Sequence, residues 1–292
     1  MHLRTYLQGN RAELKLGLVG SGIQASRTPA MHEREAAEHR LTCQYQLIDL
    51  YALGLQPDAL PEILDAAESA GFAGLNITHP CKQLVLPLLT DISADAGAIG
   101  AINTVVLRDG RRFGHNTDWL GFREGTLSKL EVASLQRVVQ LGAGGAGATT
   151  AYALLKMGCS RLTVIDHEAA RCAALVERYG REFGSDRIRE SNDIAASLAD
   201  AQGLVHATPT GMKSHPGLPL LASLLRSDLW VAEIVYFPLE TELLRQARAA
   251  GCRTLDGSGM AVHQAIGAFR LFTGLEANAD RMQRHFIAQQ PV

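Results

Sequence analysis

The sequence has 292 residues, 47% of them hydrophobic and 20% charged, which predicts one large or two medium domains with a proper core. Lys and Arg number 28 against 30 Asp and Glu, and the formal net charge of -2 gives no electrostatic reason to expect nucleic acid or an acidic membrane as a partner. The five cysteines form no CxxC pair, and no apolar stretch approaches the roughly 18 residues of a membrane span, so we expect no disulfide framework, signal peptide or membrane anchor, and a cytoplasmic location.

Short apolar runs alternate with helical patterns along the chain. In chain order, the expected strands are residues 16–19, 45–50, 74–78, 101–107, 137–141, 161–165, 203–207, 230–235 and 253–255. The expected helices are residues 59–70, 147–157, 169–179, 240–250 and 260–273. This alternation predicts an α/β fold with mostly parallel sheets covered on both faces by helices.

The chain is expected to form two domains. The apolar strand at 137–141 opens a new βα unit, the segment around 114–135 is the expected crossover into it, and the last long helix is expected to pack back onto the first domain. We predict an N-terminal α/β substrate-binding and catalytic domain at residues 1–117 plus 256–292. A Rossmann-type dinucleotide-binding domain at residues 118–255 would complete the molecule, with a cleft between the domains.

A glycine motif of the GxGxxG type follows the strand at 137–141 and opens an apolar helix. It consists of Gly142, Ala143, Gly144, Gly145, Ala146 and Gly147. The first glycine permits a tight turn, the second lets the backbone approach a pyrophosphate, and the third allows close packing of helix on strand. The alternative is a glycine-rich turn that only packs a helix. The absence of GxxxxGK[ST] disfavours a kinase or ATPase.

The next expected strand ends in Asp166, at the distance from the loop where an acidic residue binds the adenosine ribose hydroxyls. A carboxylate there accepts hydrogen bonds from two free hydroxyls but repels the phosphate that NADP carries in the same place. Glu168 adds a second carboxylate, and the nearest arginine is Arg171. The sequence therefore predicts NAD as the cofactor. The alternative is that Asp166 caps the next helix and His167 meets a phosphate.

Short polar side chains recur at the ends of the expected strands in the first domain. They are Ser26, Thr28, Asn76, Thr78, Lys82, Asn103, Thr104, Asn116 and Asp118. Such residues also cap helices and close turns, and Pro29 and Pro80 support that plainer interpretation. Because ligands of open α/β sheets bind at the carboxyl ends of strands, the cluster as a whole predicts a substrate site.

Lys82 and Asp118 are the candidates for acid–base chemistry. A lysine beside a substrate can give a proton to a ketone oxygen as hydride arrives and reclaim it in reverse, while a carboxylate orients the ammonium. The alternative is a surface lysine and a turn aspartate. The sequence has no HExxH motif, no His pair at helical spacing and no GxSxG, so it predicts neither a catalytic metal nor a serine hydrolase.

These motifs resemble those of the shikimate dehydrogenases, and more closely the quinate/shikimate dehydrogenase branch, over nearly the whole length of the chain. The segments that carry the resemblance are SRTPAMHE, NITHPCK, GAINT, GHNTD, GAGGAG, HATPTGM, EIVYFP and LDGSGMAVHQA. They are similar to the family motifs SxSP or SxTP followed by His, NxTxPxK, [AG]xNT, GxNTD, the dinucleotide loop, NATPxGM, DxxYxP and DGxxMLxxQA.

The resemblance implies roles for particular residues. It implies that the substrate is surrounded by Ser26, Thr28, Asn76, Thr78, Asn103, Asp118, Tyr236 and Gln264. It further implies that Lys82 is the acid–base catalyst and Asp118 its partner, and that a threonine at position 28 accompanies quinate use. The residues implied to line the cofactor are those of the glycine loop with Asp166, Thr208 and Met212, and Gly259 at the closing edge.

The chain departs from the family motifs at three positions. Cys81 stands where the family has an aromatic residue before the lysine, which we expect to loosen the packing there. His206 replaces the usual asparagine of NATPxGM, so the resemblance implies no role for this position. Glu233 replaces the usual aspartate before the tyrosine, a substitution that keeps the charge.

We therefore predict an NAD-dependent oxidoreductase that interconverts quinate or shikimate with 3-dehydroquinate or 3-dehydroshikimate by hydride transfer. Such an enzyme would act in the shikimate pathway of aromatic amino acid biosynthesis, as a monomer or homodimer, with a small-molecule substrate and no nucleic acid or membrane partner. Two alternatives stay open: an aminoshikimate-type dehydrogenase of a secondary pathway, and a dinucleotide-binding regulatory protein without turnover. The presence of both Lys82 and Asp118 argues against the second.

Overall fold

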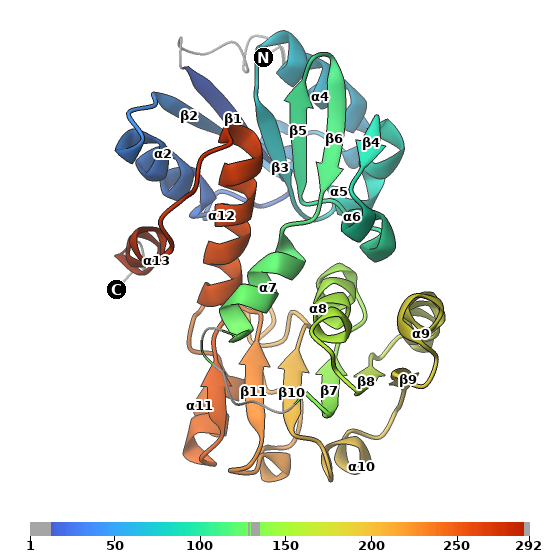
Figure 1. Cartoon of the computed structure of the whole chain (residues 1–292). Helices are drawn as coiled ribbons and strands as arrows, with labels where there is room; N and C mark the ends of the chain where they lie inside the picture. Colours follow the sequence, from blue (N-terminus) through green and yellow to red (C-terminus); the bar gives the residue numbers. More distant parts are fainter. Residues whose placement is uncertain (1–12, 128, 130–134, 289–292) are drawn as a thin grey trace. The chain divides into compact units, whose positions relative to one another are not determined.

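The computed structural model describes residues 13–127, 129 and 135–288, and within the chain it distinguishes two compact units. Unit 1 comprises residues 1–117 and 264–292, and unit 2 comprises residues 118–263. Each unit contains a six-stranded sheet with helices packed against it (Figure 1). Among the described residues, no helix combines the length and the apolar character that crossing a membrane requires.

Unit 1 is built on a sheet of strand order β2-β1-β3-β5-β6-β4. The strands are β1 (Leu14–Gly20), β2 (Cys43–Asp49), β3 (Gly74–Ile77), β4 (Asp91–Ile92), β5 (Thr104–Arg108) and β6 (Arg111–His115). Strand β5 pairs antiparallel with both β3 and β6, whereas the β1–β2, β1–β3 and β4–β6 pairs are parallel. The expected strand at 101–107 begins only at Thr104, which leaves Asn103 in the loop before it.

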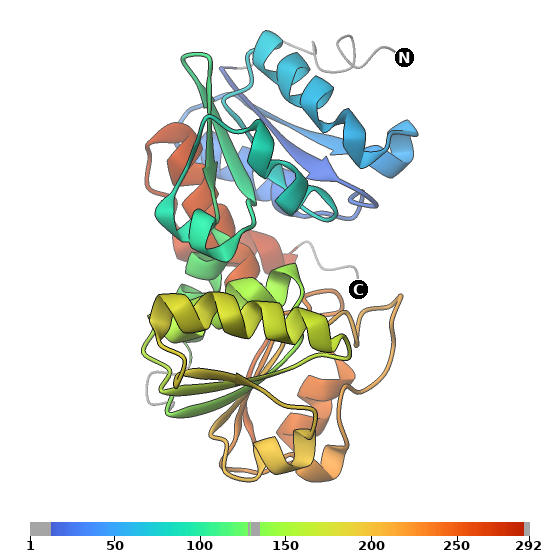
Figure 2. The ribbon, with the colours of Figure 1, turned by 90° about the vertical axis from the view of Figure 1, so that its right-hand side faces the viewer.

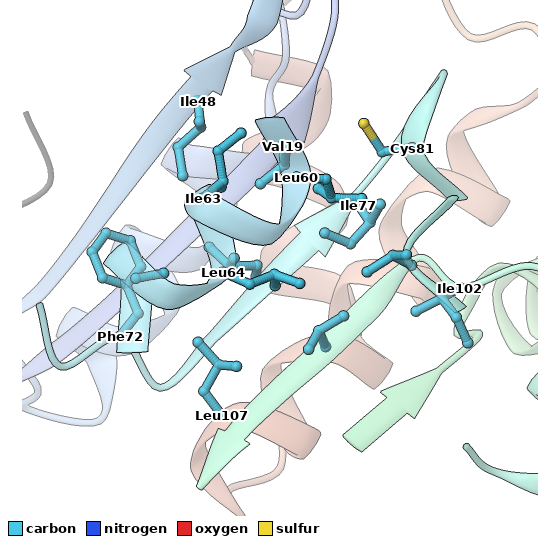
Figure 3. Close-up of a cluster of buried hydrophobic side chains, with 14 of the residues drawn as sticks. Val19, Ile48, Leu60, Ile63, Leu64, Phe72, Ile77, Cys81, Ile102 and Leu107 are labelled. Carbon is cyan, nitrogen blue, oxygen red and sulfur yellow. The ribbon is translucent and has the colours of Figure 1, made fainter. Parts of the chain in front are cut away.

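The helices of unit 1 cover both faces of this sheet. They are α2 (Thr28–Glu38), α3 (Leu50–Leu53), α4 (Leu60–Ser69), α5 (Cys81–Leu84), α6 (Ala94–Ile99) and α13 (Ala279–Ala288), with the part of α12 (Ser258–Thr273) that follows residue 263; short 3-10 turns lie at Pro57–Ala59 and Leu86–Leu88. On one face, Ile63 and Leu64 of α4 pack against Val19, Ile77 and Ile102 (Figure 3).

The opposite face of the same sheet packs against α2 and α12. Leu14, Leu16 and Leu18 alternate along β1 and contact this second cluster, to which α12 contributes Phe269 and Phe272. The alternation follows from the strand period of two, which sends successive side chains to opposite faces. Both faces are therefore buried, as expected for a largely parallel sheet.

Unit 2 holds a fully parallel sheet of order β12-β11-β10-β7-β8-β9. Its strands are β7 (Arg137–Leu141), β8 (Arg161–Ile165), β9 (Ile188–Glu190), β10 (Gly203–His206), β11 (Trp230–Glu233) and β12 (Arg253–Leu255). The chain passes from β7 to β8 and β9 on one side, then returns to build β10, β11 and β12 on the other. The order therefore reverses between β7 and β10, which is the position where ligands bind in doubly wound folds.

Helices cover both faces of the second sheet. They are α7 (Asp118–Leu127), α8 (Gly145–Lys156), α9 (Ala169–Phe183), α10 (Ile194–Leu198) and α11 (Glu242–Ala249), with a 3-10 turn at Ala222–Leu224. Figure 2 shows α9 along one face of the sheet and α11 on the other. Leu243 and Ala247 of α11 pack on Val139 and Val231 of the sheet. The two-domain α/β fold with mostly parallel, helix-covered sheets is as predicted.

The division between the units falls inside α12, at Gln264, whereas the sequence placed it at residue 256. The first turn of α12 packs within unit 2: a Cβ on Gly125 of α7 would lie 2.7 Å from the carbonyl carbon of Gly259 and 2.8 Å from the amide of Met260. The loop before α12 can be recognised from the sequence, which is why the predicted boundary lies there. A domain boundary inside a continuous helix leaves no signal in the sequence.

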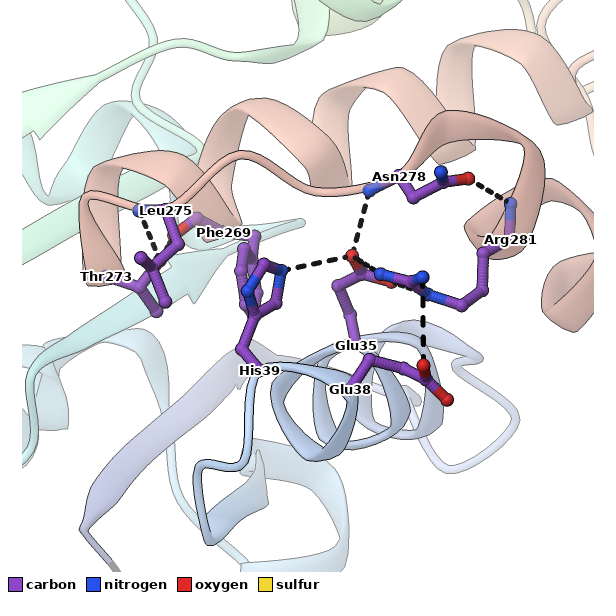
Figure 4. A network of polar contacts seen from close by, with 8 residues as sticks. All are labelled: Glu35, Glu38, His39, Phe269, Thr273, Leu275, Asn278 and Arg281. Atoms are coloured by element: carbon purple, nitrogen blue, oxygen red, sulfur yellow. Dashed lines mark hydrogen bonds and ion pairs between the residues drawn. The ribbon is translucent and has the colours of Figure 1, made fainter.

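The buried carboxylate of Glu35 holds the C-terminal helix α13 against α2 (Figure 4). Glu35, whose side chain is fully buried, accepts hydrogen bonds from the guanidinium of Arg281 at 2.6 and 2.8 Å and from the backbone amide of Asn278 at 2.8 Å. Burial alone would raise the pKa of Glu35, but these bonds and the nearby charges of Arg281 and His39 hold it below its ordinary value. The carboxylate is therefore ionised and stabilising near neutral pH.

We expect Glu35→Gln to lower the free energy of unfolding at pH 7 by about 2 kcal/mol, because it replaces charged hydrogen bonds in a buried site. Since the folded pKa lies below the unfolded one, the stabilisation is present above the unfolded Glu pKa of about 4.3 and is lost as pH falls below it. Urea unfolding at pH 7 and pH 3.5 measures the difference. Glu177→Gln, in an exposed pair with Arg181, is the control; an equal effect of both variants would contradict the assignment.

Candidate active site

Buried side-chain amides and hydroxyls form a network at the carboxyl end of strand β3 in unit 1. The carboxyl end of β3 lies beside the start of β5 and the end of β6, since Asn76 and His115 both face Thr104 in the register. Asn76 donates to Thr104 Oγ1 at 3.1 Å, and Asn103 donates to Thr117 Oγ1 at 2.9 Å. The Asn103 side-chain oxygen accepts from the Thr117 amide at 2.7 Å. The structure thus brings these predicted residues together.

The loop that carries Ser26 and Thr28 leaves the same edge of the sheet. Its first residues contact the loop after β3, because the Ser21 amide donates to the His79 carbonyl at 3.0 Å. Ser26 and Thr28 are half-buried, and the Thr28 amide donates to Ser26 Oγ at 3.3 Å as α2 begins. The structure therefore shows the plainer role of this segment, since the residues start a helix, and the substrate role of Ser26 and Thr28 stays a prediction.

Asp49, at the end of β2, fixes this loop. Its carboxylate accepts from the amides of Gly22 and Ile23 at 2.9 and 3.1 Å and from the side chain of Gln24 at 2.9 Å. Burial alone would raise the pKa of Asp49, but the hydrogen bonds from Gln24 and the backbone amides hold it below its ordinary value. An ionised, buried Asp49 therefore sets the path of the chain toward Ser26.

Lys82 lies on α5, the short helix after β3. Its carbonyl oxygen accepts from the Ile102 amide at 2.8 Å, and its side chain is half-buried. Cys81, the residue before it, is fully buried in the core against Ile77 and Val85 (Figure 3). The position where the family has an aromatic residue is thus filled by a small apolar side chain, and this anchor holds the backbone of Lys82.

The glycine loop of unit 2 joins β7 to α8. Gly142 has φ +105°, which favours glycine, and a Cβ on Gly147 would lie 2.2 Å from the Gly142 carbonyl oxygen. Nothing lies within 4 Å of the positions where Gly144 and Gly145 would carry a Cβ. The three glycine functions expected from the motif are thus separable: the turn needs Gly142, the packing of α8 needs Gly147, and Gly144 leaves open space.

Gln140, on strand β7, holds the glycine loop through buried hydrogen bonds. Its fully buried side-chain amide donates to the carbonyls of Gly142 and Gly147 at 2.9 and 2.8 Å, and its oxygen accepts from Thr150 at 2.8 Å. Every hydrogen-bonding group of the Gln140 amide lies against the loop or α8. Gln140 was not among the residues predicted from the sequence, although a glutamine inside an apolar strand is a recognisable signal.

Asp166 follows β8 and binds the glycine loop directly. Its side chain is 5% exposed and accepts from the Ala143 amide at 2.7 Å and the Glu168 amide at 2.9 Å. Burial alone would raise the pKa of Asp166, but these two bonds and the nearby His167 and Arg171 hold it below its ordinary value. An ionised carboxylate therefore lies beside the loop, on the β8 side of β7.

The carboxyl end of β10 lies on the other side of β7. A Cβ on Gly142 would be 2.5 Å from the Ala207 carbonyl oxygen and 3.1 Å from Thr208 Cγ2, so this loop packs directly on the glycine loop. His206, the last residue of β10, bonds Glu233 of β11 through Nδ1 at 2.9 Å and Thr208 Oγ1 through Nε2. Two departures from the family motifs are thus in direct contact with each other.

Five further predicted residues are divided between the units. Gln264 lies on α12 one turn before Gly267, whose Cβ position is 3.3 Å from Thr117, and so belongs with unit 1. Asp118 begins α7 in unit 2, directly after Thr117. The other three lie in unit 2: Met212 and Tyr236 are exposed at 39% and 44%, and Gly259 is buried beside Gly125. The described residues contain no group of three or more His, Cys, Asp or Glu that could hold a metal ion.

Comparison with known proteins identifies the family of the chain. The family model described as "Shikimate dehydrogenase substrate binding domain" matches residues 18–105, and that described as "Shikimate 5'-dehydrogenase C-terminal domain" matches residues 257–285. A Shikimate dehydrogenase (NADP(+)) of Streptomyces avermitilis is 55% identical over 91% of this chain and 92% of its own length. The chain belongs to the shikimate dehydrogenase family.

Other relatives of this family member carry a different cofactor in their names. A Quinate/shikimate dehydrogenase (NAD(+)) of Corynebacterium efficiens is 47% identical over 96% of this chain and 99% of its own length. The structure is similar to that of quinate dehydrogenase from Corynebacterium glutamicum in complex with NAD, with a TM-score of 0.89 and 47% identity over 94% of this chain and 99% of that one. The relatives thus agree on the reaction class and differ in cofactor.

The glycine loop allows folding and dinucleotide binding to be tested separately. Gly144→Ala should leave the free energy of unfolding within about 0.5 kcal/mol of wild type, because φ is -71° and the space is open, yet weaken NAD binding at least about tenfold by filling the pyrophosphate approach. Gly147→Ala should destabilise by about 1–3 kcal/mol, since its Cβ would strike a backbone carbonyl. Calorimetric NAD titration and urea unfolding measure both; wild-type NAD affinity in Gly144→Ala would refute the assignment.

Proposed function

We propose that the chain is an NAD-dependent dehydrogenase that interconverts quinate or shikimate with the corresponding 3-dehydro acids. The observation that carries this proposal is that one chain of this family has a polar cluster in unit 1 and a glycine loop in unit 2. Unit 1 offers buried amides, hydroxyls and Lys82 at the carboxyl ends of its strands. Unit 2 offers a glycine loop at the reversal point of its sheet, with an ionised Asp166 beside it.

The residues of unit 2 fit a nicotinamide dinucleotide. The open space at Gly144 and Gly145 leaves room for a pyrophosphate against the start of α8, where free amides and the helix dipole favour an anion. Asp166 and Thr208 end neighbouring strands on opposite sides of β7, so they suit the adenosine and nicotinamide halves respectively. When bound, the dinucleotide supplies a hydride acceptor and donor at its nicotinamide ring.

Lys82 is the group that we propose moves the proton. Its ammonium Nζ gives a proton to a substrate ketone oxygen in one direction, and its amine takes the hydroxyl proton in the other. The buried anchor at Cys81 and the bond from Ile102 to the Lys82 carbonyl hold the backbone that carries this side chain. We propose Asp118 as the carboxylate that orients the ammonium, with Ser26, Thr28, Asn76, Thr78, Asn103, Tyr236 and Gln264 binding substrate hydroxyls and carboxylate.

Two alternatives are distinguished by one turnover assay with quinate and shikimate and with both cofactors. An aminoshikimate-type dehydrogenase would turn over neither acid well but would act on the amino analogue. A dinucleotide-binding regulator would bind NAD without any turnover. The proposal expects oxidation of at least one acid, and Thr28 supports quinate as the substrate to test first. No oxidation of quinate at any pH would remove quinate from the proposal and leave shikimate.

Lys82→Ala should reduce kcat by about 10²–10⁴-fold and leave NAD binding near wild type, because general acid–base catalysis is worth that factor and the lysine lies in the other unit from the glycine loop. Steady-state kinetics and NAD titration measure the two effects. Lys15→Ala, another part-buried lysine of unit 1, is the control and should retain kcat. A near-native kcat in Lys82→Ala would show that another group moves the proton.

Asp166 is the proposed reason for a preference for NAD over NADP. Its carboxylate is ionised and little exposed, Glu168 adds charge, and the guanidinium of Arg171 is 2.8 Å from Glu168 rather than turned toward a phosphate site. Nδ1 of the exposed His167 lies 3.0 Å from Asp166 Oδ1. A phosphate dianion there would meet like charge.

The test is the ratio of kcat/KM for NAD to that for NADP, in wild type and in Asp166→Asn. Because Asp166 also binds the Ala143 amide, the variant can disturb the loop, but such a general loss cancels in the ratio. We expect wild type to prefer NAD and Asp166→Asn to lower the ratio about tenfold or more. An NADP preference in wild type would end this part of the proposal. An unchanged ratio in the variant would place the cause elsewhere.

A further inference from the structure

His206 and Glu233 form a buried pair at the carboxyl ends of β10 and β11. Both side chains are essentially inaccessible, with exposures of 0% and 1%. The imidazole Nδ1 lies 2.9 and 3.0 Å from the two carboxylate oxygens, and the ring contacts Thr208 Oγ1 on its other side through Nε2. A charged side chain in such a buried position must be fully hydrogen-bonded to be tolerated.

The carboxylate of Glu233 is surrounded by donors. It accepts from the Val235 amide at 3.0 Å and from the hydroxyl of Thr241 at 3.0 Å, in addition to His206. Thr241 in turn accepts from the Leu244 amide as the N-cap of α11. Because an ionised carboxylate only accepts, the imidazole nitrogen that faces it must carry a proton.

The direction of the next hydrogen bond follows from the tautomer of His206. In a neutral ring with its proton on Nδ1, Nε2 accepts a hydrogen bond from the Thr208 hydroxyl. Thr208 Oγ1 then has only lone pairs left, one of which accepts from the Thr210 amide at 3.3 Å. In this tautomer the chain from Glu233 through His206 makes Thr208 a pure acceptor toward a group that approaches the end of β10.

The same pair holds the whole loop from Thr208 to Met212. At its far end, a Cβ on Gly211 would lie 3.3 Å from the Thr241 side chain and 4.0 Å from Glu233 Oε2, so this loop packs back on the pair. At its near end, the Thr208 methyl lies against Gly142 of the glycine loop. The pair thus connects β11 and α11 with the surface on which the nicotinamide half of a dinucleotide would lie.

We propose that His206 and Glu233 are positioning residues that present Thr208 Oγ1 as a hydrogen-bond acceptor to the carboxamide end of the nicotinamide dinucleotide. The inference rests on the proposed function, since it concerns the cofactor of that reaction. A carboxamide carries two N–H donors beside its carbonyl oxygen, and an acceptor selects the orientation in which the N–H group faces Thr208. The adenosine half gains nothing from the pair, because Asp166 lies on the other side of β7.

The experiment compares binding of NAD and of ADP-ribose, which lacks the nicotinamide ring, by calorimetry of the full chain. Thr208→Val and His206→Asn should each weaken NAD binding roughly tenfold, about the value of one hydrogen bond, and leave ADP-ribose within about twofold of wild type. The double variant His206→Asn with Glu233→Asp restores the residues that the family motifs have here and should recover NAD binding to within about threefold. His215→Asn, the same change at an exposed position of the neighbouring segment, is the control.

A second measurement reads the tautomer in the wild type. Long-range ¹H–¹⁵N spectra of ¹⁵N-histidine-labelled wild type should show the His206 ring, assigned by its loss in His206→Asn, in the Nδ1–H form. An Nε2–H form would overturn the inference, as would equal losses of NAD and ADP-ribose or no recovery in the double variant. Wild type that binds NAD without oxidising either acid would overturn the proposed function alone. Wild type that binds neither ligand would overturn both.

Discussion

Backbone amides that leave the carboxyl end of a parallel strand lose their ladder partners, and buried polar side chains satisfy them throughout this protein. Asp49 binds the amides after β1, Asn103 binds the amide of Thr117 after β6, and Asp166 binds the amide of Ala143 after β7. Glu233 binds the Val235 amide after its own strand β11. Each of these four loops is thus held by a side chain from a neighbouring segment or from the strand that it follows.

This way of holding loops has an electrostatic consequence. The carboxylates that receive these amides are little exposed, yet Asp49 and Asp166 keep a pKa below the ordinary value because hydrogen bonds outweigh the cost of burial. Asp166 orders the glycine loop, and in the proposed function its charge would also set the potential at the adenosine ribose. A change at this residue affects both, which is why a ratio of cofactor efficiencies is more informative than either efficiency alone.

His206 and Glu233 depart from the family motifs, and the tertiary structure shows that the two departures are connected. In the sequence they are 27 positions apart, and each looks like an isolated exception to a motif. Parallel pairing of β10 with β11 places the two residues opposite each other in register, where an imidazole and a longer carboxylate fill the space together. The polarity that we propose for Thr208 depends on both residues, although both side chains are buried.

Much of the architecture follows from local sequence. The mainly apolar runs at Arg137–Leu141 and Arg161–Ile165 are strands with the bounds expected, because buried parallel strands read as largely apolar segments. Arg253–Leu255 also has the bounds expected, although only Leu255 is buried. The elements that were not predicted from the sequence include α5, which has only four residues, and β6, in which only Gly114 is buried. The turn at Asp109 and Gly110, both with positive φ, was an available signal for the β5–β6 hairpin.

The candidate site divides in the same way. The glycine loop, Asp166 and Lys82 could be named from the sequence because their chemistry is unusual at a strand end, and the family resemblance could be named from motif order. Gln140, Asp49 and the contact between His206 and Glu233 required the tertiary structure. Their partners are distant in sequence or belong to the backbone, and hydrogen bonds of that kind leave no periodic pattern. Residue types and spacing determined which chemistry is present; only strand pairing decided which side chains hold it in place.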